Sequence, residues 1–100
     1  MKQKTYIEKA VAEHFQVSKE DIYDTSKNVY PFSAARSVLM YMLYASREYK
    51  IYEIQKMFGY SARRTVEYRI ASVSSSVKKD VGKFAEDVKA IQEKLNEKIK

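Results

Sequence analysis

The chain has 100 residues, which is enough for one domain with a single modest core. It is 45% hydrophobic and 32% charged, so it is too apolar for a disordered segment and too charged for a membrane-spanning one. Because it has no cysteine and one histidine, disulfides, thiolate metal sites and a two-histidine metal site within one chain are excluded.

The low content of turn-forming residues argues against an enzyme. Two glycines and one proline leave no glycine-rich loop to hold a phosphate, and the G-x-x-x-x-G-K-[ST] motif of an ATPase does not occur. The longest apolar run, residues 38–44, is far shorter than the roughly twenty residues of a spanning helix, and no secretory signal follows Met1. We therefore expect a cytoplasmic, non-enzymatic domain with no cofactor, no bound metal and no membrane partner.

The net charge of +6 is concentrated in the middle of the chain. Residues 1–26 have four lysines and five acidic residues, whereas residues 27–77 have five arginines and three lysines against three acidic residues. Arginine is the side chain best suited to fork onto phosphate oxygens or a guanine edge. This distribution is typical of a nucleic-acid-binding surface, although charge alone fits equally well a basic domain whose charge prevents self-association.

Apolar residues repeat at helical spacing almost throughout, which predicts an all-α bundle of five or six helices in a single domain over residues 1–100. A first helix opens after Thr5, its expected N-cap, and has its inward residues between positions 7 and 15. Ser18 caps a very short second helix. Residues 24–31 have no period and are expected to form a loop. The longer helix that begins near Ser33 has an apolar stripe wide enough for a central position.

The second half of the chain continues with three helices. A short helix over residues 51–58 ends at Gly59, which suits the left-handed geometry of a helix C-terminus. Ser61 is expected to cap a longer helix that extends to Val77. A polar stretch with a weak helix breaker then separates this helix from a last one over residues 84–95.

Residues 50–77 have the pattern of a helix-turn-helix, in which the second helix enters the major groove of DNA by its N-terminal end. A buried stripe would fix the angle of this helix, and its exposed start would contact the DNA. That start consists of Ser61, Ala62, Arg63, Arg64 and Thr65, followed by Tyr68 and Arg69. Cations near a helix N-terminus oppose the helix dipole, so an anionic partner explains them better than helix stability does. This interpretation requires that the guanidinium groups of Arg63 and Arg64 point outward.

The whole chain resembles the C-terminal DNA-binding domain (domain IV) of the bacterial replication initiator DnaA, a domain of the Trp-repressor-like class. The stretches that carry the resemblance are VAEHFQVSKEDIYDTSK (11–27), AARSVLMYML (34–43), IYEIQKMFG (51–59) and GKFAEDVKAIQEKL (82–95). The resemblance implies double-stranded DNA as the partner, with replication or mobile-element proteins as further candidate partners. In this resemblance, Arg36 occupies a position at which the family also has an arginine.

The chain departs from the family in the residues that would contact DNA. The family signature Asp-His-Thr-Thr-Val corresponds to residues 62–66, where this chain has Ala-Arg-Arg-Thr-Val. The family's basic loop retains only Lys27, whereas Lys50 adds a cation before the helix-turn-helix. We therefore expect a diverged homologue that binds DNA with altered or little specificity and has no ATPase of its own. The candidate DNA-binding residues are Lys27, Arg36, Lys50, Ser61, Arg63, Arg64, Thr65, Tyr68 and Arg69.

The alternative is a protein-interaction module that keeps the fold and has lost DNA binding, which the poor basic loop and the nine tyrosines favour. An enzyme is the least favoured interpretation. His14 is expected on the inward face of its helix as a structural residue, and the neighbouring carboxylates Glu86 and Asp87 are expected on a solvated helix surface rather than as an acid–base pair.

Overall fold

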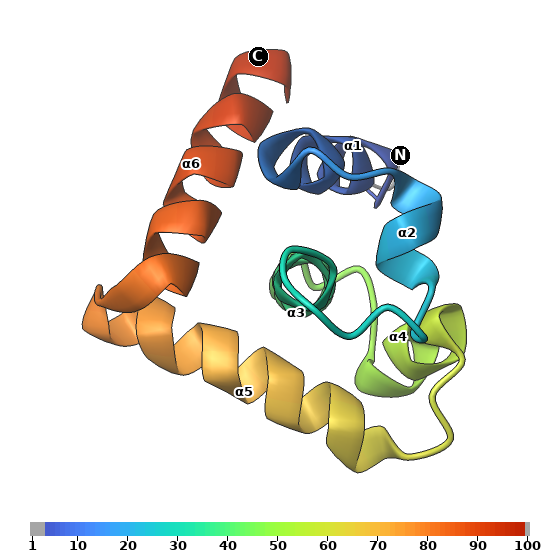
Figure 1. Cartoon of the computed structure of the whole chain (residues 1–100). Coiled ribbons are helices and arrows are strands. Elements are labelled where there is room, and N and C mark those ends of the chain that lie inside the picture. The colour runs from blue at the N-terminus through green and yellow to red at the C-terminus, as the bar shows by residue number, and fades with distance from the viewer. Residues whose placement is uncertain (1–3, 100) are drawn as a thin grey trace.

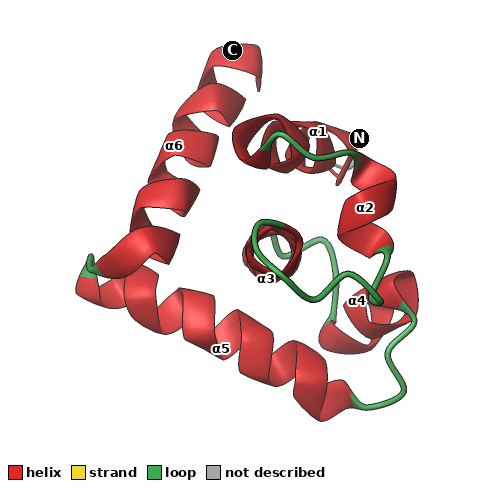
Figure 2. Cartoon of the chain, in the orientation of Figure 1, coloured by secondary structure: helices red, strands yellow, loops and turns green. Residues whose placement is uncertain are grey.

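The computed structural model describes residues 4–99, with the side chains of residues 4–97. Over this range the chain is all-α, as predicted, and forms six helices with no strand (Figure 1, Figure 2). The helices are α1 (Lys4–Phe15), α2 (Lys19–Tyr23), α3 (Phe32–Ala45), α4 (Ile51–Phe58), α5 (Arg63–Lys79) and α6 (Gly82–Ile99).

The central helix is α3, which packs against each of the other five helices. It is seen end-on in Figure 1, with the remaining helices arranged around it. Val38, Leu39 and Leu43 are fully buried, so this helix supplies the middle of the core. The wide apolar stripe predicted this position, because a helix covered on several sides needs apolar residues on more than one face.

The ends of the short helices follow from local chemistry. Ser18 caps α2 as predicted, since its Oγ accepts a hydrogen bond from the backbone N–H of Asp21 at 3.1 Å. Gly59 ends α4 with a φ of 70°, the left-handed geometry that favours glycine. The predicted cap at Ser61 is wrong: Ala62 occupies the N-cap of α5, and no side chain caps that helix.

A buried polar contact joins α1 to α6. His14 lies 2.7 Å from Asp87, between Nε2 and Oδ1, and Lys83 donates to the same oxygen at 3.0 Å. The structural role expected for His14 is therefore confirmed. The expectation that Asp87 lies on a solvated surface is wrong, because its side chain is 1% exposed.

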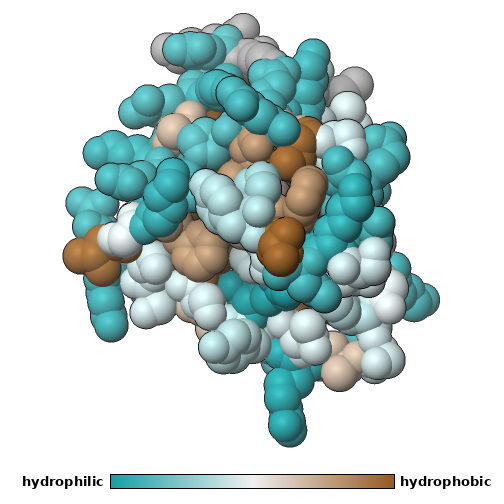
Figure 3. Space-filling model, in the orientation of Figure 1, coloured by the Kyte–Doolittle hydropathy of each residue, from teal (hydrophilic) through white to brown (hydrophobic). Residues whose placement is uncertain are grey.

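Figure 3 shows one face of the molecule. Hydrophilic residues and residues of intermediate hydropathy cover most of this face, and a few apolar residues gather near its centre. Among the helices of the described residues, none has the length and apolar character needed to span a bilayer.

Candidate nucleic-acid interface

The connection between α4 and α5 is short and internally hydrogen-bonded. Beside the left-handed Gly59, the backbone N–H of Tyr60 donates to the carbonyl of Gln55 at 3.2 Å. The side-chain amide of Gln55 donates in return to the carbonyl of Tyr60 at 3.0 Å. Because these bonds join the end of α4 to the connection that leads into α5, they restrict the direction in which α5 begins.

The inward stripe of α5 fixes the rotation of this helix about its axis. Val66, Ile70 and Val73 are all buried, at the three- and four-residue spacing of one helix face. Through this face α5 packs against α3, α4 and α6. The opposite face is consequently directed away from the core.

The residues at the exposed start of α5 are named the leading surface: Ser61, Arg63, Arg64, Thr65 and Tyr68. All are exposed except Thr65, which is half-buried, and the Tyr68 side chain is the most open of the large hydrophobic ones, at 73%. The first turn of α5 contains no acidic residue. Its backbone N–H groups have no side-chain cap and are a favourable place for an anion.

The two arginines of the leading surface point into solvent, as the helix-turn-helix interpretation requires. Glu67, one turn further along α5, lies 3.5 Å from the Nε of Arg63. Both side chains of this pair are about half exposed or more, so their attraction is screened and weak. Arg63 can therefore leave Glu67 for another anion at little cost in free energy. No ion pair of Arg64 is seen among the described residues, so its guanidinium is the more available of the two.

Arg69 has a different place from the one predicted. Its Nη1 donates to the Oγ of Ser37 at 2.9 Å and to the carbonyl and Oγ of Ser33 at 3.2 and 3.3 Å. These bonds connect α5 to the start of α3, so Arg69 positions α5. Ser33 and Ser37 were missed as site residues, although their four-residue spacing places them on one helix face.

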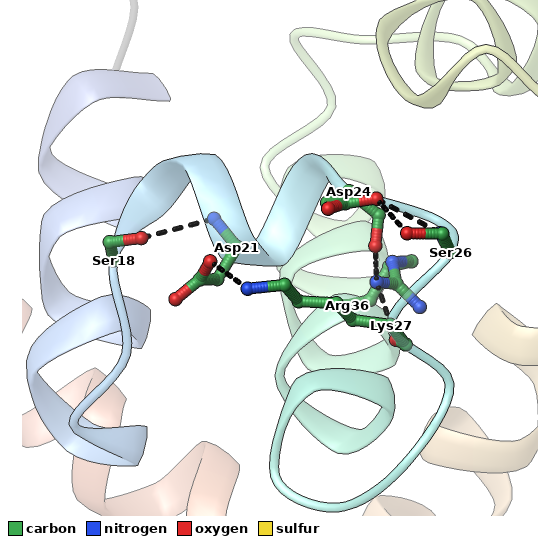
Figure 4. Close-up of polar contacts among 6 residues, drawn as sticks. All are labelled: Ser18, Asp21, Asp24, Ser26, Lys27 and Arg36. Carbon is green, nitrogen blue, oxygen red and sulfur yellow. Dashed lines mark hydrogen bonds and ion pairs between the residues drawn. The ribbon is translucent and has the colours of Figure 1, made fainter.

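Arg36 also differs from the expectation, because its side chain is 0% exposed. Its Nε donates to the carbonyl of Ile22 at 2.8 Å, and its Nη2 donates to the carbonyls of Asp24 and Lys27 at 2.6 and 3.0 Å (Figure 4). Burial lowers the pKa of this guanidinium below its usual range. A DNA contact by Arg36 is not compatible with this burial, and its role is to hold the chain that leads from α2 to α3.

Of the two predicted lysines, Lys27 lies apart from the leading surface, whereas Lys50 lines a groove together with Arg63. Lys27 donates to the Oδ1 of Asp21 at 2.6 Å (Figure 4), and its ammonium also lies 5.2 Å from the centre of the Phe32 ring. The hydrogen bond to Asp21 raises the pKa of Lys27, and the bond from Lys27 lowers the pKa of Asp21. Lys50 is exposed at the N-cap of α4, where its backbone N–H donates to the Oε1 of Glu53 at 2.8 Å.

Comparisons with protein-family models, curated proteins and solved structures find no match to this chain. The fold brings five of the nine predicted residues together at the start of α5.

Proposed function

We propose that α4 and α5 act as a helix-turn-helix and that the leading surface binds double-stranded DNA. In such a motif the second helix inserts by its N-terminal end, where side chains reach the base edges and phosphates flank the helix. The single observation that carries the proposal is the exposed, uncapped start of α5 with two outward arginines and no acid in its first turn. Neither arginine contributes to the core, so an anionic partner is their physical explanation.

The residue types suggest how a duplex would be held. Arginine can bind guanine through two parallel hydrogen bonds or bind a phosphate, and the Thr65 hydroxyl can serve either base or phosphate. Arg69 and its two serine partners would hold α5 at a fixed position against α3 while these contacts form. The resemblance to the C-terminal domain of DnaA points to the same partner.

The charge distribution predicts a target different from that of the family. Lys27, the remaining cation of the 24–31 loop, is already paired with Asp21, and Arg36 is buried. The loop therefore contributes little to a groove beside the one that α5 would enter. Base recognition would then depend on the leading surface, and selection of bound sequences from random duplexes would identify the target.

The test is the affinity for duplex DNA as a function of salt, measured by fluorescence anisotropy. We expect the double variant Arg63→Ala/Arg64→Ala to weaken binding and to reduce the slope of log K against log salt by about 1.8, because each lost phosphate contact removes about 0.9. Lys9→Ala/Lys89→Ala removes the same charge from exposed positions on α1 and α6 and is the matched control. Equal affinity and slope in the two double variants would exclude the leading surface.

A protein-interaction module remains a second candidate, favoured by one observation. Val29 and Tyr30 are 67% and 65% exposed at the tip of the loop between α2 and α3, where cations would be expected in a DNA-binding loop. Exposed apolar side chains at a loop tip suit a protein partner better than a phosphate backbone. Absence of any mobility shift with random duplexes at low salt would favour this candidate.

A further inference from the structure

A groove lies beside α5, formed by the end of α3, the 46–50 connection, the start of α4 and one side of α5 from Arg63 to Lys78. Its volume is about 800 Å³, which is in the upper part of the range of pockets that hold drug-sized ligands. It is an open groove rather than an enclosed cavity, so an extended chain can pass through it.

Two exposed aromatic rings line this groove. Tyr44 at the end of α3 and Tyr52 in the first turn of α4 are 45% and 54% exposed. Neither ring belongs to the buried core, whereas Tyr41, which also lines the groove, is half-buried and packs against the core. Tyr44 and Tyr52 therefore expose their ring faces to solvent, and packing of the core does not account for either ring.

Four cations line the same groove: Arg47, Lys50, Arg63 and Lys78. All four are exposed, and the described residues that line the groove include no acidic side chain, although Glu67 lies 3.5 Å from Arg63 outside this lining. They come from three parts of the fold, namely the 46–50 connection (Arg47 and Lys50), the start of α5 and its last turn. The groove thus combines a positive rim with aromatic surface.

We infer that this groove binds single-stranded nucleic acid, with bases stacked on Tyr44 and Tyr52 and phosphates held by the surrounding cations. Proteins that bind single strands combine a positive groove with aromatic side chains on which the bases stack. A duplex keeps its bases stacked on each other and cannot offer their faces to these rings. An acidic peptide would use the cations but leave the rings without a role.

This site overlaps the leading surface at Arg63 but does not depend on duplex binding. Lys50, which was predicted as a duplex contact, also lines the groove. The tyrosines of the groove and Arg64 of the leading surface are not shared. Substitutions at these unshared positions therefore separate failure of one proposal from failure of the other.

The experiment measures binding of a fluorescein-labelled (dT)12 strand, an abasic strand of the same length and a twelve-base-pair duplex. We expect the abasic strand to bind at least tenfold more weakly than (dT)12, because it loses the stacking of two bases, each of which contributes about fivefold or more. Equal affinity for the two strands would overturn the inference, since the groove would then recognise charge alone. Binding of an oligo(U) strand in parallel shows whether RNA is also accepted.

Substitutions at the two rings give the second arm. Tyr44→Leu/Tyr52→Leu is expected to weaken (dT)12 binding about a hundredfold, whereas Tyr44→Phe/Tyr52→Phe keeps the rings and restores it. Tyr6→Leu, a ring 42% exposed on α1, is the control and should bind as the native chain does. All substituted positions are exposed, and urea unfolding confirms that each variant folds.

The two proposals then give opposite patterns. Loss of (dT)12 binding with unchanged duplex binding in the Tyr→Leu double variant supports the groove. Arg64→Ala should leave (dT)12 binding unchanged and weaken duplex binding. Unchanged (dT)12 binding in the Tyr→Leu double variant would overturn the inference whatever the duplex result.

Discussion

Substitution of Arg36 by Met tests whether the buried guanidinium stabilises the fold. The change removes three hydrogen bonds from a charged donor to the carbonyls of Ile22, Asp24 and Lys27. At about 1.5–3 kcal/mol for each bond to a charged group, the gross loss is about 4.5–9 kcal/mol. Burial of the guanidinium cation costs several kcal/mol of desolvation free energy. Because Met carries no charge, the variant avoids this cost, which offsets part of the loss of hydrogen bonding. We expect a net decrease of about 3 kcal/mol in the free energy of unfolding.

The assay is urea unfolding followed by circular dichroism at the helical wavelength. With a slope of about 1–3 kcal/mol per molar urea, Arg36→Met should lower the midpoint by about 1–3 M. Arg64→Met makes the same chemical change at an exposed position and should alter stability by no more than about 0.5 kcal/mol. A loss below about 1 kcal/mol in Arg36→Met would refute the reasoning, because desolvation would then cancel the three bonds.

Three further predictions concern local contacts. The pKa of Asp21 is lowered from 3.8, so its pairing with Lys27 stabilises the fold above pH 3.8. This stabilisation is lost as the pH falls through the folded-state pKa of Asp21. In Lys27→Ala, NMR titration should show the Asp21 pKa rising toward 3.8. His14→Ala leaves the buried Asp87 carboxylate short of a partner and should cost about 1–3 kcal/mol in urea unfolding, so an unchanged midpoint would contradict this account. Gly59→Ala should cost about 1–2 kcal/mol by thermal unfolding, from the left-handed backbone alone, since an added Cβ would meet nothing within 4 Å.

The features predicted correctly from sequence depend on periodicity and on local chemistry. The all-α class follows from apolar spacing, and the central place of α3 from the width of its stripe. Gly59 and Ser18 were identified because their roles involve neighbours within a few positions. The cap of α5 was misplaced by one residue, from Ser61 to Ala62, because the path of the preceding turn decides where the helix begins.

The features that the sequence did not predict depend on contacts between distant segments. Asp87 is buried and contacts His14, which is 73 positions away in the chain, so its sequence neighbours do not indicate its burial. Arg36 and Arg69 have the same side chain as Arg64, yet their partners lie in the 22–27 segment and at the start of α3. Backbone carbonyls and serine hydroxyls have no sequence pattern that marks them as partners of an arginine. Charge was thus visible from sequence, whereas its division into buried and exposed guanidinium groups required the fold.

The packing of α1 against α6 has a practical consequence for how the chain can be attached to a surface. Figure 1 shows the start of α1 and the end of α6 on one side of the molecule and the first turn of α5 on the opposite side. If the leading surface binds a duplex as proposed, an affinity tag, a biotin or a fused fluorescent protein attached on the side of α1 and α6 would face away from it. Immobilisation from that side is then expected to leave duplex association rates the same as those of the free chain.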